Sequence, residues 1–258
     1  MPVMDRVRGR VVALLACLLL ATGCDPGAVR ALGGEAPRAG ADRQDRGQHP
    51  RQDHGQRDRP ARVVAPPRGR VDVPVTRAVR MLRRAPERSA GYERDAFAHW
   101  TDADGDGCDT RDEVLLDESL RPRRTRAGED CRITGGAWRS AYDGERTRDP
   151  STFDVDHVVP LADAWGSGAR AWTDARRERF ANDLGDPRSL VAVTASSNRS
   201  KSDRDPAEWL PDLARCRYVR DWVAVKVRWD LAADATERSV LTRRARGCGG
   251  RVVVRVAR

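Results

Sequence analysis

A long polar stretch, from residue 25 to about residue 70, limits where this 258-residue chain can fold. It consists largely of Arg, Asp, Gln, Gly and Pro and contains almost no large apolar side chain. Such a segment buries too little apolar surface to offset the entropy lost on ordering, so we expect a disordered linker over residues 25–75. Its two histidines, His49 and His54, are expected to be solvated rather than metal-bound. The globular domain is then expected over residues 76–258, a length that suits a single domain.

The N-terminus has the pattern of an export signal over residues 1–24. Three arginines precede the apolar run of residues 11–21, which is too short to span a bilayer. The run ends in small residues before Cys24, as in a bacterial lipobox, and Cys24 would then be lipidated. Ordinary signal cleavage nearby, with Cys24 incidental, is the alternative. Both predict an extracellular or cell-surface protein, whose membrane contact is limited to an N-terminal lipid anchor.

Export also constrains the cysteines. Once Cys17 is removed with the signal and Cys24 is set aside, four remain: Cys108, Cys131, Cys216 and Cys248. They form no C-x-x-C pair, which argues against a zinc knuckle, and an oxidising compartment favours two disulfides. Four cysteines allow three pairings. We expect Cys108–Cys131 and Cys216–Cys248, because each of these pairs brackets one contiguous region.

The pattern of apolar residues predicts a helix-rich α+β domain with a small sheet. A doubly wound sheet is disfavoured, because its strands would be longer and more apolar. Helices are expected from about residue 76 to before Pro86, at 92–100, 161–165 and 174–184, after Thr194, and at about 216–229 and 235–246. Short strands are expected at 132–134, 138–142, 153–158, 190–193 and 252–256, the last as an added edge.

Three segments could together hydrolyse a phosphodiester bond: residues 154–160, 190–193 and 196–203. The reaction needs a base for the attacking water and a cation for the charge on the phosphate and the leaving oxygen. His157 and Asp156 adjoin at a strand end, where neighbouring side chains point to opposite faces. A helix packed across the strands can add the amide oxygen of Asn198. Because Mg²⁺ accepts one or two protein oxygens, Asp156 and Asn198 would suffice.

At these positions the sequence resembles the HNH, or ββα-metal, nucleases. The Asp-His-x-x-Pro signature lies at 156–160 and the Asn-x-x-Lys signature at 198–201. The particular resemblance is to secreted bacterial HNH proteins related to the C-terminal domain of the GmrSD restriction enzyme, and it covers about residues 76–250. Four further segments share it: 107–111, 164–169, 180–183 and 209–211. The two signatures are also similar to those in the HNH domain of CRISPR effector nucleases.

The resemblance implies an exported, metal-dependent endonuclease that cuts nucleic acid, with DNA as the expected substrate, and a helix-rich domain around a ββα core. His157 would be the general base, since an imidazole titrates near neutral pH. Asp156 and Asn198 would hold Mg²⁺ or Mn²⁺, with Asp154 in support. Arg199 and Lys201 would lie near the phosphate. Ser189 occupies the place of the Asn that steadies the histidine loop, and its shorter reach predicts a less firmly oriented His157.

A second pattern begins at Asp102. Together with Asp104, Asp106 and Glu113 it fits the ligand spacing of an EF-hand loop and predicts a separate Ca²⁺ site. The alternative, which the sequence favours, is an acidic turn in which Asp109 or Thr110 caps a helix over residues 111–116.

Overall charge supports a nucleic-acid partner only weakly. The formal net charge is +9, and a basic excess favours polyanions. However, all but Lys201 and Lys226 of the 48 basic residues are arginine, which is typical of a bias toward GC-rich codons. Two other functions stay open: a Ca²⁺-stabilised surface binding module with a decayed HNH framework, and a toxin-like effector. The sequence indicates no particular protein partner.

Overall fold

The computed structural model describes residues 69–121, 124–126 and 131–257. The predicted signal peptide, Cys24 and most of the predicted linker lie outside these residues. The chain divides into two units, residues 1–58 and 59–258, and every described residue belongs to the second. Among the described helices, none has the length and apolar character needed to cross a membrane.

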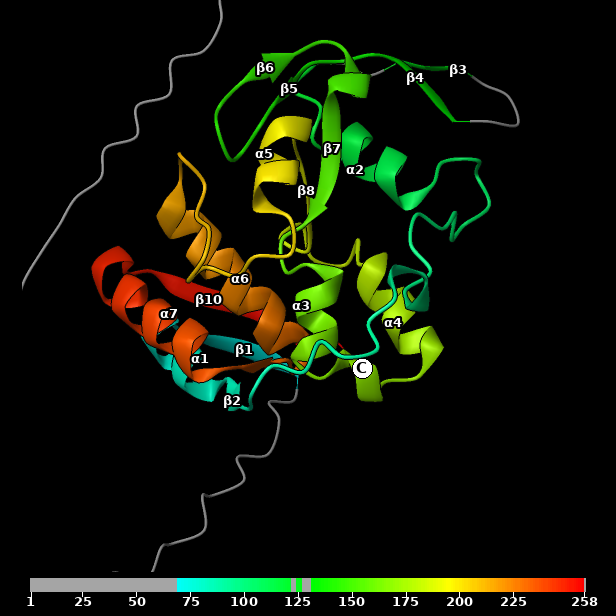
Figure 1. Ribbon diagram of the computed structural model, residues 1–258. Helices are drawn as coiled ribbons and strands as arrows, with labels where there is room; N and C mark the ends of the chain where they lie inside the picture. Colours follow the sequence, from blue (N-terminus) through cyan, green and yellow to red (C-terminus); the bar gives the residue numbers. More distant parts are fainter. Residues whose placement is uncertain (1–68, 122–123, 127–130, 258) are drawn as a thin grey trace, which may run out of the picture. The chain divides into compact units, whose positions relative to one another are not determined.

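The described part is α+β, as predicted, and pairs its strands two by two (Figure 1). Four pairs are antiparallel: β1 (Arg70–Pro74) with β10 (Arg251–Arg255), β3 (Arg124–Arg126) with β4 (Arg132–Gly135), β5 (Trp138–Arg139) with β6 (Arg146–Thr147), and β7 (Phe153–His157) with β8 (Leu190–Thr194). The parallel pair is β2 (Arg83–Arg84) with β9 (Ala232–Ala233). The α-helices are α1 (Val75–Met81), α2 (Thr110–Asp117), α3 (Leu161–Gly166), α4 (Asp174–Ala181), α5 (Ala195–Lys201), α6 (Arg215–Trp229) and α7 (Ala235–Cys248).

The larger hydrophobic core surrounds α6, which packs against α1, α7 and β10. Trp222 and Val223 of this helix are fully buried. The predicted disulfide Cys216–Cys248 is confirmed and joins the first turn of α6 to the end of α7. Because apolar residues occupy most of its turns, α6 forms the centre of the core instead of covering one side of it.

A smaller core lies between α2 and one face of the β7–β8 pair. Leu115 and Trp138 are buried in it, and the Trp138 indole N–H donates to the Leu115 carbonyl at 2.7 Å. Gly136 makes this packing possible, since a Cβ there would lie 2.5 Å from the Trp138 ring. The second predicted disulfide, Cys108–Cys131, is also confirmed and ties the loop before α2 to the residue preceding β4.

Two sequence predictions need correction. The last residues of the predicted linker are structured, because Val71 and its neighbours form β1 against β10. The predicted helix over 92–100 is wrong: only a 3₁₀ turn, Arg94–Ala96, is present. Phe97 packs in the larger core whereas Trp100 packs against the smaller one. A helix would place these two side chains on the same face, so the backbone becomes extended at Phe97 and left-handed at Trp100 (φ 61°).

Candidate active site

Two paired strands, β7 and β8, and the helix α5 that packs against them form the frame of the candidate site (Figure 1). Strands β7 and β8 pair antiparallel, with His157 opposite Leu190, and α5 contacts both of them. Thr194 ends β8 and caps α5, its hydroxyl accepting from the Ser197 N–H at 3.3 Å. This cap turns the chain directly from β8 into the helix that carries Asn198.

The face of β7 toward α5 is polar. Asp154 and Asp156 are two residues apart and so share this face. The Asn198 amide N–H donates to Asp154 at 3.0 Å, and the Lys201 ammonium donates to Asp156 at 2.9 Å. The predicted ligands Asp156 and Asn198 therefore lie on one side of the strand. Their direct contacts, however, are with Lys201 and Asp154 rather than with each other.

Asp156 is buried and held from two sides. One carboxylate oxygen accepts from Lys201, and the other accepts from the Tyr142 hydroxyl at 2.6 Å. Burial raises the pKa of Asp156, while the neighbouring Lys201 cation acts in the opposite direction. The sequence had not indicated Tyr142, because its hydroxyl reaches Asp156 only through the folding of the β5–β6 region over the site.

Lys201 is fully buried, which does not agree with the predicted contact to a substrate phosphate. Besides Asp156 it donates to the His157 carbonyl at 3.0 Å. Its ammonium group thus connects α5 to the end of β7. Arg199, in contrast, is exposed on the same helix.

His157 projects from the opposite face of β7, toward α4 and Trp100. Its Nε2 lies 2.8 Å from the Ala181 carbonyl oxygen. Because a carbonyl can only accept, Nε2 carries the hydrogen in this bond and Nδ1 is left unprotonated. The ring is 7% exposed and lies 5.3 Å from the Trp100 ring, centroid to centroid. Burial lowers the pKa of His157 to about 3, well below the near-neutral value expected from the sequence, so the imidazole is neutral and only weakly basic at ordinary pH.

Ser189 does not contact the His157 ring. Its hydroxyl donates to Asp183 at 2.7 Å, and its carbonyl accepts from the Val158 N–H at 3.0 Å. It therefore steadies the backbone just after His157, while the Ala181 carbonyl orients the imidazole itself. The segment 180–183 carried part of the family resemblance, and this was the available signal for the role of Ala181.

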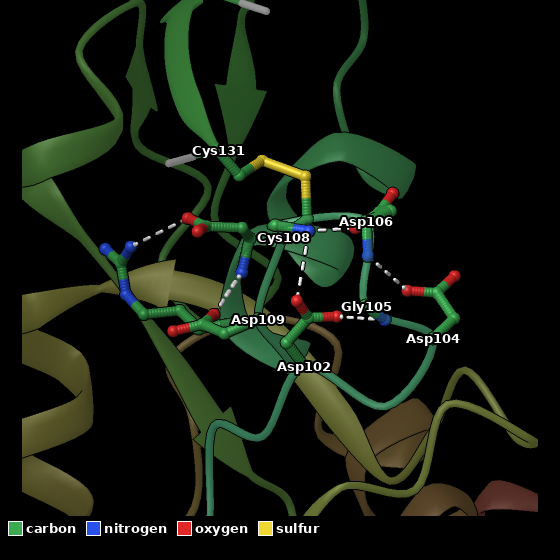
Figure 2. The surroundings of a disulfide bond; sticks show 10 residues. Asp102, Asp104, Gly105, Asp106, Cys108, Asp109 and Cys131 are labelled. Atoms are coloured by element: carbon green, nitrogen blue, oxygen red, sulfur yellow. Dashed lines mark hydrogen bonds and ion pairs between the residues drawn. A yellow bond between two sulfur atoms is a disulfide. The ribbon is translucent and has the colours of Figure 1, made fainter. Parts of the chain in front are cut away.

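The acidic loop after Trp100 forms a turn stabilised by its own carboxylates (Figure 2). Asp102 accepts from the N–H groups of Gly105 and Gly107, and these bonds, chiefly that of Gly107, lower its pKa. Asp102, Asp104 and Asp106 offer oxygens that lie within 4.8 Å of one another. Asp106 forms a second such group with Glu113 and Cys108, although the Cys108 sulfur is committed to its disulfide.

The predicted helix cap at this loop is confirmed. Asp109 precedes α2, and its carboxylate accepts from the Asp112 N–H at 2.9 Å. The acidic turn therefore leads directly into the capped start of α2, which packs against the β7–β8 pair.

Strands β7 and β8 and helix α5 thus carry Asp156 and Asn198 on one side of β7 and His157 on the other. The model of the family described as GmrSD restriction endonucleases, C-terminal domain, matches residues 109–244, more than half of the chain. The protein belongs to this family. Its membership suggests a nuclease-like function that acts on nucleic acid.

One curated protein is similar to this chain over most of its described part. An uncharacterized secreted protein of Arthroderma benhamiae is 42% identical over 160 residues, which cover 61% of this chain and 76% of the relative. The two disulfides are consistent with an extracellular location. No solved structure matches the chain.

Proposed function

We propose that the protein is an exported, metal-dependent HNH endonuclease that hydrolyses phosphodiester bonds in nucleic acid, with DNA as the expected substrate. The observation that supports this most directly is that Asp154, Asp156 and Asn198 share the α5 side of β7. On the other face of the strand, the Nε2–H of His157 is bound to the Ala181 carbonyl, which leaves Nδ1 as the unprotonated ring nitrogen. The same strand carries Asp154 and Asp156 toward the helix of Asn198.

The residues on the α5 side of β7 fit Mg²⁺ or Mn²⁺. The donors there are carboxylate and amide oxygens, which hard divalent cations prefer. Asn198 uses its amide nitrogen on Asp154, so its amide oxygen remains as an acceptor. We propose Asp156 and Asn198 as ligands, joined by Asp154, which is only half-buried; Asp156 would bind through an oxygen that also accepts from Lys201 or Tyr142. A divalent cation bound there would stabilise the charge that develops on the phosphate and the leaving oxygen.

The protein's own groups then have separate tasks. Ala181 holds His157 in the Nε2–H tautomer, and Nδ1 takes the proton from the attacking water. Tyr142 and Lys201 fix the carboxylate of Asp156 and act as positioning residues. Packing of Trp100 and Phe180 around the ring disfavours the imidazolium, so the base is uncharged before the reaction.

Plasmid nicking tests the proposal. The wild-type protein should nick plasmid DNA with Mg²⁺ or Mn²⁺, and EDTA should stop the reaction. His157→Ala should lower the rate by about 10²–10⁴-fold. His99→Ala serves as the control, because His99 is the other described histidine and contacts the backbone of Phe97.

A second variant separates loss of catalysis from loss of the fold. His157→Gln keeps an N–H donor for the Ala181 carbonyl but offers no ring nitrogen, so it should remain folded and inactive. A folded His157 variant that cuts at the wild-type rate would contradict the assignment of the base.

Calcium binding by the loop of Asp102, Asp104, Asp106 and Glu113 is a second proposal, supported by the mutual approach of the oxygens of the three aspartates and by that of Glu113 to Asp106. Calorimetric titration with Ca²⁺ should show binding that Asp104→Asn weakens. Asp149→Asn, in another acidic turn, should leave the binding unchanged. Calcium binding without cleavage under any divalent metal would favour the surface binding module instead.

Export and lipidation at Cys24 are proposed from the sequence, since these residues lie outside the described part. Expression with a radiolabelled fatty acid should label the wild-type protein and not Cys24→Ser. Release of the unlabelled wild-type protein into the medium would favour ordinary signal cleavage.

A further inference from the structure

An open hollow of about 550 Å³ lies between the β5–β6 hairpin and the start of α5, which are drawn beside each other at the top of Figure 1. Its lining combines two arginines with side-chain hydroxyls: Arg146, Thr147, Thr152, Thr194, Ser196 and Arg199. Two segments distant in sequence, 145–153 and 194–199, supply these residues, so the hollow exists only in the folded chain.

The hollow adjoins the candidate active site. Arg199 follows Asn198 directly on α5. Phe153, which also lines the hollow, precedes Asp154 on β7 and pairs with Thr194 of β8. A strand whose phosphate lay at Asp154 and Asn198 would therefore have its neighbouring nucleotide at the hollow.

The two arginines of the hollow are free to bind a ligand. Both side chains are exposed, and within the part of the chain that the structure describes neither guanidinium has an ion-pair or hydrogen-bond partner. Other arginines near the site are committed: Arg188 binds Asp186 and Arg228 binds Asp183. Unpaired guanidinium groups beside hydroxyl donors are the combination that recognises phosphate oxygens.

We infer that this hollow binds the phosphodiester backbone of a nucleic-acid strand next to the bond that is cut, with Arg146 and Arg199 each contacting a phosphate. The inference rests on the proposed nuclease function. Glu145 also lines the hollow, and its negative charge opposes the binding of a phosphate. Removal of the Glu145 charge should therefore strengthen phosphate binding in the hollow, whereas removal of either arginine should weaken it.

Steady-state cleavage of a fluorescent DNA oligonucleotide by the full-length protein tests the subsite. Arg146→Ala and Arg199→Ala should each raise KM by about tenfold with little change in kcat, since they bind the substrate away from the reacting atoms. Glu145→Gln should lower KM. Arg243→Ala is the matched control, because Arg243 is an exposed arginine that lines a separate hollow of about 1150 Å³ beside α7.

Binding without metal gives a second measurement. In EDTA, the anisotropy of the same oligonucleotide should report weaker binding by the double variant of Arg146 and Arg199. The slope of log K against log salt should also be shallower by about 1–2 units. Unchanged KM and salt slope in both arginine variants, with wild-type cleavage intact, would overturn the subsite and leave the nuclease proposal standing. Failure of the wild-type protein to cut any nucleic acid would instead overturn the nuclease proposal.

Discussion

Both lysines of the chain are fully buried, and each neutralises a carboxylate. Lys201 binds Asp156, and Lys226 lies between Asp163 and Glu237 at 2.9 and 2.7 Å. An ammonium group is compact and directs its three N–H bonds in different directions, which suits these enclosed places better than a planar guanidinium. In a chain that otherwise uses arginine, lysine marks positions where the cation is enclosed.

Removal of the Lys201 cation should therefore cost stability. Lys201→Met leaves the buried Asp156 without its counter-ion and should lower the free energy of unfolding by about 3–5 kcal/mol. Arg199→Ala, two residues away on the exposed side of α5, should change it by less than about 0.5 kcal/mol. Urea unfolding of both variants measures the difference, and equal effects would contradict the buried role of Lys201.

Glu118 gives the fold a pH dependence of its own. Burial raises its pKa from 4.5 to about 7, although its carboxylate accepts from the Ala192 N–H of β8. The folded protein therefore holds this proton more tightly than the unfolded chain does. The contribution of protonated Glu118 to the stability of the fold is fully present below pH 4.5 and is lost as the pH rises through 7.

The variant Glu118→Gln should remove this dependence, because the amide does not titrate but can still accept from Ala192. The stability of wild type relative to the variant should fall by an amount on the order of 2 kcal/mol between pH 4.5 and 7.5. Unfolding free energies measured across this range provide the check. If the unfolding free energies of wild type and Glu118→Gln change with pH in parallel, Glu118 does not titrate as described.

At the scale of elements, the short helix α5 depends on a neighbouring turn. Asp143, between β5 and β6, accepts hydrogen bonds from the hydroxyls of Thr194 and Ser197 at the start of α5. These bonds lower the pKa of Asp143 against the effect of its partial burial, which raises it. The turn thus anchors the helix that presents Asn198.

Loss of this anchor should affect both stability and cleavage. Asp143→Ala should lower the free energy of unfolding by about 1–2 kcal/mol and reduce cleavage, because α5 would hold Asn198 less firmly. Asp149→Ala is a matched control, since Asp149 also accepts from a nearby N–H, that of Ser151, but does not contact α5. Thermal and urea unfolding, measured beside plasmid nicking, test whether the two effects occur together.

For the whole molecule, the Cys216–Cys248 disulfide joins α6 to α7, the two longest of the described helices. It closes a sequence separation of 32 residues, for which the chain-entropy relation gives about 3–4 kcal/mol of stabilisation. The double variant to serine should lose about this amount in guanidinium unfolding. A reducing agent should destabilise the wild-type protein more than this variant, and an equal response would contradict the assigned contribution.

Much of the frame could be predicted from local patterns. Alternating apolar residues mark β7 and a short apolar run marks β8. Thr194 has the residue type of a helix cap, and helical periodicity marks α6 and α7. The disulfide pairing followed from short separations along the chain. The helix expected over 92–100 failed because Phe97 and Trp100 pack into two different cores, which a local pattern does not reveal.

The sequence by itself determined that Asp156, His157 and Asn198 belong to one two-stranded, one-helix unit, because strand, cap and helix signals act over a few residues. Only the tertiary structure decided that Nδ1 of His157 is the unprotonated nitrogen, that Lys201 is enclosed with Asp156, and that Arg146 joins Arg199 in one hollow. Each of these depends on a partner supplied by a distant segment: a carbonyl from α4, a hydroxyl from Tyr142, a guanidinium from β6. The tautomer of His157, the burial of Lys201 and the unpaired charge of the two arginines each depend on the surroundings of the side chain, and these surroundings form only when the whole chain packs.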